Sequence, residues 1–261
     1  TLSATFGLHA SLTLSDETLR RCRDQNPDDI GFHVHVAEHF SDEDDSQVKS
    51  GTRVVDRLDK FGILGPKTIA VHCVHVDQHE TELLRTSGTW VTHQPRSNMN
   101  NAVGMAAVES MMRAGIKVCL GNDGFSNAMW EEWKAAYFAH KLWHHDPRRM
   151  GGYDVIKMAV YHNAEIVANQ FEGLRTGEIA VGAAADLMLV DYQPITPLTA
   201  GNLPWHILFG FNESMITTTI ARGKVLMLNR ELLTLDEEKI AFEARRLAAK
   251  VWKRYENQFT S

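Results

Sequence analysis

Short β-rich runs alternate with segments of helical spacing through the first half of the chain, and this alternation limits the possible folds most strongly. A polar or glycine-containing turn follows each run. The five β-rich runs are residues 5–9, 31–37, 68–73, 89–92 and 117–120. The segments between them carry apolar residues three or four positions apart, and we expect helices at residues 16–23, 47–61, 78–85 and 105–114.

Strands separated by helices predict an α/β fold with a parallel sheet covered on both faces, either a doubly wound sheet or a (β/α)8 barrel. A complete barrel takes about 250 residues and eight strand-helix units. This chain shows the repeat only in its first half. If the fold is a barrel, its first strands lie outside this sequence.

The second half of the chain differs in character. A longer helical region follows Gly121, and its aromatic residues are spaced for one buried face. Strand-like runs at 186–191, 216–220 and 224–227 indicate part of a small β domain, and residues 236–255 form a charged, alanine-rich surface helix. We expect a partial barrel at 1–172, a β-sandwich part with its linker at 173–230, and a C-terminal helical segment at 231–261.

Composition excludes several classes of protein. The net charge is -6 and no Lys/Arg-rich stripe occurs, so a nucleic-acid partner is not expected. No apolar run approaches the roughly 20 residues of a membrane span. The three cysteines, Cys22, Cys73 and Cys119, are irregularly spaced, which indicates structural thiols in a reducing compartment rather than disulfides. We expect a cytoplasmic protein that acts on a small molecule.

Imidazoles and carboxylates follow the ends of successive predicted strands. His33 and His35 share one strand face because side chains alternate with period two, and Glu38 follows at the strand end. The next strands end near His72, His93 and Asp123. The carboxyl ends of parallel strands meet at one rim, where barrel enzymes do their chemistry, and imidazole and carboxylate groups bind zinc and iron. Hydrogen-bonded core or surface histidines are the alternative interpretation.

Five sequence stretches, in this order, resemble the aminohydrolase branch of the amidohydrolase superfamily, which includes guanine, cytosine, chlorotriazine and thiomethyladenosine deaminases. They are Gly-Leu-His-Ala at 7–10, His-Val-His-Val-Ala-Glu at 33–38, Ala-Val-His-Cys-Val-His-Val at 70–76, Thr-His-Gln-Pro-Arg-Ser-Asn at 92–98 and Leu-Gly-Asn-Asp-Gly at 120–124. A finer likeness, to SsnA-type aminohydrolases, rests on residues 96–104, on Glu131-Glu132 with His140-Lys141, and on residues 197–210.

The resemblance implies about strands 4–8 of a distorted (β/α)8 barrel, and it implies a role for each matching residue. His35 and Asp123 match metal ligands, while His72 matches a histidine that binds metal in some members and contacts substrate or water in others. Glu38 matches the proton shuttle. The remaining two matches, His9 and His93, correspond to substrate-facing positions.

The resemblance also implies one divalent metal, with zinc expected and iron the alternative, and a homo-oligomer. The family's strand-1 His-x-His ligands are absent here, so this chain alone is expected to bind metal weakly. Gln94 stands where the family commonly has Asn. Binuclear members of the superfamily usually bridge two metals with a carboxylated lysine at the end of strand 4, and residues 4–10 contain no lysine. The resemblance therefore implies a mononuclear enzyme that hydrolyses a C–N bond of a nitrogen heterocycle. Hydrolysis of another C–N or a C–halogen bond, and a non-catalytic barrel scaffold, are the alternatives.

Overall fold

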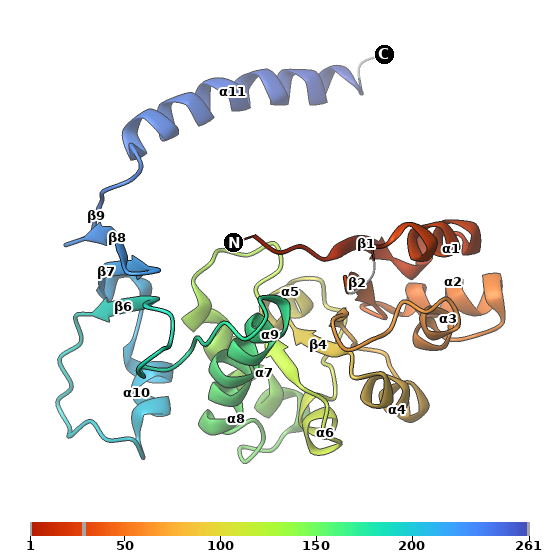
Figure 1. Ribbon diagram of the computed structural model, residues 1–261, viewed down its shortest axis with the longest axis horizontal. Coiled ribbons are helices and arrows are strands. Elements are labelled where there is room, and N and C mark those ends of the chain that lie inside the picture. The colour runs from red at the N-terminus through yellow and green to blue at the C-terminus, as the bar shows by residue number, and fades with distance from the viewer. Residues whose placement is uncertain (1, 28–29, 260–261) are drawn as a thin grey trace. The chain divides into compact units, whose positions relative to one another are not determined.

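A computed structural model describes residues 2–27 and 30–259, which divide into two units (Figure 1). The first unit is Thr1–Ala183 with Pro194–Phe211, and the second is Ala184–Gln193 with Asn212–Ser261. Within the described stretches, no helix combines the length and the apolar character needed to cross a membrane.

The first unit is built on a five-stranded sheet in which every neighbouring pair of strands is parallel. The strands lie in sequence order, with His35 opposite Val71 and Val91 opposite Val118 in the register. They are β1 (Phe6–Ala10), β2 (Phe32–Val36), β3 (Ile69–His72), β4 (Trp90–His93) and β5 (Val118–Leu120). The predicted α/β fold and all five predicted strands are confirmed.

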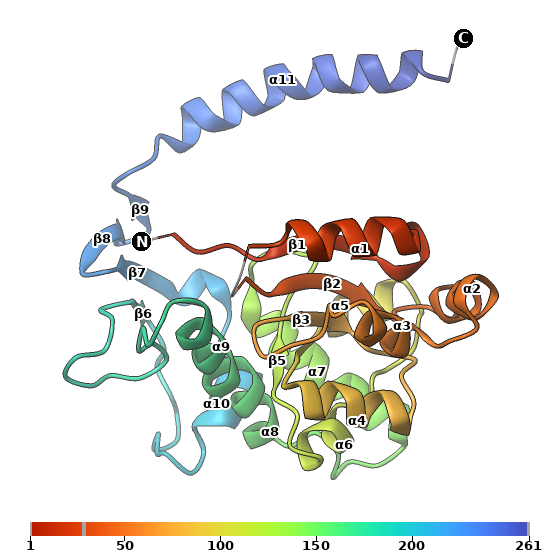
Figure 2. The same ribbon diagram turned by 45° about the vertical axis from the view of Figure 1, so that its right-hand side comes forward.

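Helices connect the strands and continue after β5 (Figure 2). Those up to β5 are η1 (Ser11–Thr13), α1 (Asp16–Gln25), α2 (Phe40–Ser50), α3 (Val54–Lys60), α4 (Gln78–Ser87), α5 (Pro95–Asn100) and α6 (Val108–Arg113). Those after β5 are α7 (Met129–His144), α8 (Gly152–Ile156), the π-helical η2 (Lys157–His162), α9 (Asn163–Gln170) and α10 (Leu203–Gly210).

The prediction of a single helix at residues 47–61 is wrong, because the chain forms two helices there, α2 and α3. Gly51 ends α2 in the left-handed conformation, with φ of 68°, a region that glycine adopts without steric cost. Arg53 then begins α3 with an extended backbone. The helix predicted at 105–114 is present only as the shorter α6, and α5 and α10 were not predicted.

The helices that connect the strands cover one face of the parallel sheet. Val34, Val91 and Val118 on that face are fully buried in the hydrophobic core. Leu58 of α3 and Leu84 of α4 belong to the same core. Burying such a side chain contributes about 1.5–3 kcal/mol, so this layer fixes the strands and the positions of their ends.

Side chains from the region after β5 cover the outer edge of that strand. The Asn163 side chain accepts a hydrogen bond from the Leu120 N–H at 3.1 Å and donates one to the Leu120 carbonyl at 3.0 Å. His162 donates from Nδ1 to the Val118 carbonyl at 2.8 Å. These three backbone groups face the outer edge of β5, the last strand of the five-stranded sheet, and side chains satisfy them.

The second unit contains a four-stranded antiparallel sheet and a long helix. The strands are β6 (Leu187–Val190), β7 (Ile216–Ala221), β8 (Lys224–Leu228) and β9 (Glu231–Leu232), with η3 (Glu213–Met215) before β7 and α11 (Glu237–Asn257) after β9. Arg222 and Gly223 join β7 to β8 with φ of 50° and 73°, as a tight type I′ hairpin requires. The three predicted strands and the final helix are confirmed, and β9 was not predicted.

Candidate metal and catalytic site

Three strands of the parallel sheet end in residues with left-handed backbones. Ala37 follows β2 with φ of 45°, His72 ends β3 with φ of 72°, and Asp123 follows β5 with φ of 51°. Residues other than glycine adopt this conformation at a cost of about 1–3 kcal/mol, and such strain gathers at functional sites. The strained residues therefore mark one rim of the sheet.

Glu38, His72 and Asp123 meet at this rim, with ligand atoms that all lie within 4.8 Å of one another. The Nε2 atom of His72 is 3.6 Å from Oε2 of Glu38 and 3.7 Å from Oδ2 of Asp123. Residues from three separate parts of the sequence thus converge on one point.

The His72 ring has one satisfied nitrogen and one nitrogen without a partner. Nδ1 lies 2.9 Å from Oδ1 of Asn98 and donates to it, so Nε2 carries the lone pair of the neutral ring. That Nε2 is buried and has no hydrogen-bond partner. Burial is the largest influence on the His72 pKa and lowers it, while the two carboxylates raise it. The histidine is therefore held in the form that binds a metal.

These observations fit a bound divalent metal. Ligand atoms at 2.0–2.2 Å from a tetrahedral zinc are about 3.4 Å apart, close to the separations between His72 and the two carboxylates. Separations of this size exceed a hydrogen bond, and an unpaired buried imidazole nitrogen is unfavourable without a partner. Neutral imidazole and carboxylate oxygens are also the donors that zinc and iron accept.

His35 and His9 lie beside this cluster. The His35 ring stacks on the His72 ring with centroids 5.6 Å apart. Its Nδ1 donates to the His9 carbonyl at 2.7 Å, which leaves the lone pair on Nε2, as in a metal-binding histidine whose other nitrogen is oriented by a backbone group. The exposed His9 ring packs edge-on against His35 at 5.5 Å, so the predicted residues His9, His35, Glu38, His72 and Asp123 lie at one rim.

Helix α5, which sequence reasoning missed, orients the residues of the cluster. Besides the Asn98 bond to His72, Ser97 donates to Oδ2 of Asp123 at 2.7 Å. Asn101, directly after the helix, donates to Oε1 of Glu38 at 3.1 Å. The signals for this helix were Pro95 at its first turn and the dense polar run that follows it.

Arg96 of the same helix holds the loop that carries Asp123. Its guanidinium bonds the buried Glu132 at 2.5 Å and the Ser126 carbonyl at 2.7 Å, and it lies over the Phe125 ring. Burial raises the pKa of Glu132, which the hydrogen bonds from Arg96 oppose. A paired, buried charge of this kind fixes the loop after β5.

A cavity of about 520 Å³ opens on the sheet face that the strand-connecting helices leave uncovered. His33, His35, Asp123 and residues of α9 line it. His93 was predicted to face the substrate. Side chains alternate along a strand, so His93 points to the opposite face from Thr92 and Gln94, which line the cavity. The structure places His93 fully buried, with Nε2 3.2 Å from Nε2 of His140 on α7.

The parallel sheet with its strand-end donors has the architecture of about half an amidohydrolase barrel. The chain belongs to the Amidohydrolase family, whose sequence model matches residues 1–226.

Named relatives and a solved structure agree with this membership. The chain is 34% identical over 248 residues to a 5'-deoxyadenosine deaminase of Methanosarcina mazei, covering 93% of this chain and 56% of that protein. It is also 34% identical over 254 residues to a 5-methylthioadenosine/S-adenosylhomocysteine deaminase of Dictyoglomus thermophilum, covering 95% and 59%. An adenosine deaminase from Xanthomonas campestris with bound zinc superposes with a TM-score of 0.85 at 25% identity, covering 95% and 57%. The chain thus spans little more than half the length of these relatives.

Proposed function

We propose that this chain carries the main part of the active site of a metal-dependent aminohydrolase that removes the exocyclic amino group of an adenine nucleoside. The observation that carries the proposal is the buried, unpartnered His72 Nε2 facing two carboxylates. The relatives named as deaminases of adenosine, 5'-deoxyadenosine and 5-methylthioadenosine support the substrate class. The finer likeness to SsnA-type enzymes is a prediction that these comparisons do not address.

In this proposal His35, His72 and Asp123 hold one divalent metal, zinc or iron. When bound, the metal supplies Lewis-acid activation that lowers the pKa of water toward about 7. Asp123 takes one proton from the attacking water. Glu38, held at the rim by Asn101, carries that proton to the ring nitrogen, and it then carries the second water proton, released as the C–OH group becomes C=O, to the departing amine. The C–NH₂ group and water become C=O and ammonia.

The neighbouring residues orient the reacting groups. Ser97 bonds one carboxylate oxygen of Asp123 and fixes its direction, while Asn98 holds the His72 ring. His9, exposed beside His35, is the predicted contact to the substrate. The cavity over the sheet face offers the space for a planar heterocycle, since binding sites for small ligands are of about 300–1,000 Å³.

The experiment measures ammonia release by the longest natural polypeptide that contains this sequence, after it has been loaded with zinc. We expect release from 5'-deoxyadenosine and 5-methylthioadenosine, and none from cytidine at equal concentration. The matched variants are Asp123→Asn, expected to be inactive, and Asp44→Asn at an exposed position of α2, expected to be active. Chloride release from a chlorotriazine in place of ammonia release would favour the C–halogen alternative. No turnover of any of these substrates would leave the scaffold interpretation.

A further inference from the structure

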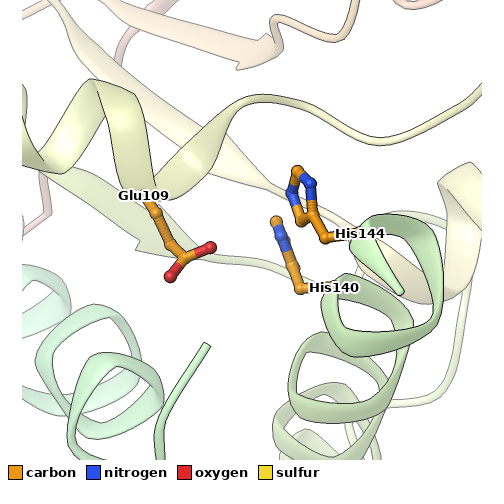
Figure 3. Close-up of side chains that lie close together, drawn as sticks. All are labelled: Glu109, His140 and His144. Carbon is orange, nitrogen blue, oxygen red and sulfur yellow. The ribbon is translucent and has the colours of Figure 1, made fainter. Parts of the chain in front are cut away.

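A second group of metal-ligating side chains lies outside the site described above. Among the residues that the structure describes, Glu109, His140 and His144 bring one ligand atom each to within 4.8 Å of the others. Figure 3 shows Glu109 on α6 pointing toward the two imidazole rings on α7.

The sequence explains how two of these donors come together. His140 and His144 are four residues apart on α7, so they lie one above the other on the same helix face. Their rings are nearly parallel, with centroids 6.1 Å apart and planes inclined by 27°. Glu109 belongs to the first turn of α6, and its carboxylate points toward this face of α7.

One donor atom of this group lacks a partner. The His140 side chain is 0% exposed, and its Nδ1 is buried with no hydrogen-bond partner. Its other nitrogen, Nε2, lies 3.2 Å from Nε2 of the buried His93. When the His140 Nε2–H donates to His93, the lone pair is on Nδ1. A histidine that donates from one nitrogen and binds metal through the other is the common arrangement in metal sites.

The three side chains have a close cationic neighbour, Arg149. A cation already lies at the group, because Arg149 Nε is 2.9 Å from Oε2 of Glu109 and Nη2 is 3.4 Å from Nε2 of His144. The Arg149 side chain is 29% exposed.

We propose that Glu109, His140 and His144 form a second zinc site, at which the metal and the Arg149 guanidinium compete for the same donors. Two imidazoles and one carboxylate are a known zinc donor set, with water completing the tetrahedron. The ion would join α6 to α7, and through His140 it would fix His93 at the end of β4. This inference stands apart from the proposed deaminase activity, because none of its ligands belongs to the first site.

The test is a titration of zinc chloride into the metal-stripped 261-residue chain carrying Asp123→Asn, which weakens the first site. Adding His144→Asn is expected to lower the remaining zinc affinity at least about tenfold, since even the loss of an outer hydrogen-bond partner costs that much. His144 is only half-buried, so the variant is expected to fold, which circular dichroism checks.

Two further variants complete the design. His145→Asn changes the neighbouring exposed histidine, which lies outside the group, and is expected to leave the affinity unchanged. Arg149→Gln removes the competing cation and is expected to raise the affinity. Equal zinc affinity in the His144→Asn and His145→Asn proteins would overturn the proposed site, and unchanged or weaker binding by Arg149→Gln would overturn the competition.

Discussion

Asn98 fixes the His72 ring by accepting a hydrogen bond from its Nδ1 at 2.9 Å, which directs the lone pair of Nε2 toward Glu38 and Asp123. Asn98→Ala removes this acceptor, and we expect the zinc affinity of the first site to fall by about 10–100-fold. The measurement is a competition titration in the His144→Asn background, so that the second group does not contribute.

Asn98→Asp keeps an acceptor for His72 and is expected to retain most of the affinity that Asn98→Ala loses. Met99→Ala, at an exposed position of the same helix, is the matched control and is expected to bind zinc as the unchanged protein does. Equal losses in the Asp and Ala variants would contradict a role for the hydrogen bond.

Glu38 lies in the donor group, yet we assign it the proton transfer rather than metal binding. Glu38→Gln preserves the size of the side chain but cannot carry a proton at neutral pH. We expect kcat for deamination to fall by about 10²–10⁴-fold while zinc content is retained. Elemental analysis beside the rate measurement separates the two roles, since loss of the metal together with activity would make Glu38 a ligand.

Asn163 satisfies both backbone groups of Leu120 at the edge of β5. Asn163→Ala leaves a buried N–H and C=O without partners, and we expect the free energy of unfolding to fall by about 2 kcal/mol or more. Glu165→Ala, two residues along, breaks only the exposed ion pair with Lys117 and is expected to cost less than about 1 kcal/mol. Urea denaturation of both variants measures the difference, and equal losses would contradict the edge role of Asn163.

Glu43 gives the first unit a pH-dependent stability. Burial, followed by repulsion from Glu80, raises its pKa from 4.5 to about 7. The folded state therefore holds the proton more tightly than the unfolded state, so this contribution is complete below pH 4.5 and is lost as the pH rises to about 7. Glu43→Gln removes the loss, and we expect it to raise the unfolding free energy at pH 8 by the order of 2–3 kcal/mol relative to its effect at pH 4.5.

The control for this pH effect is Asp44→Asn, which removes an exposed carboxylate on the same helix. Thermal unfolding at the two pH values is expected to show a pH-dependent gain for Glu43→Gln alone. A gain of equal size at both pH values would exclude titration of Glu43 as its cause.

The positions of the strands along the chain were predictable because β-rich runs and polar turns are local signals. The break at Gly51 was harder to predict, since residues on both sides of it favour helix and only the left-handed glycine ends α2. Helix α10 was missed because the preceding linker is irregular, although Pro204 at its first turn is a helix-start signal.

The rim of the site was predictable from residues at successive strand ends, because parallel strands deliver their ends to one edge. The partners from α5 were not, since Asn98 is 26 residues from His72 and such pairing depends on tertiary packing. The buried contact between His93 and His140 likewise joins β4 to α7 across 47 residues. The alternation of side chains along β4 would, however, have been enough to place His93 on the opposite face from Thr92 and Gln94.

The most direct test of the central claim is anomalous diffraction at the zinc edge from crystals of the zinc-loaded protein. The account predicts a peak within about 2.0–2.2 Å of the His72 Nε2 and of an Asp123 carboxylate oxygen. Zinc-loaded crystals with no peak between these two residues would contradict a metal site at the rim of the parallel sheet.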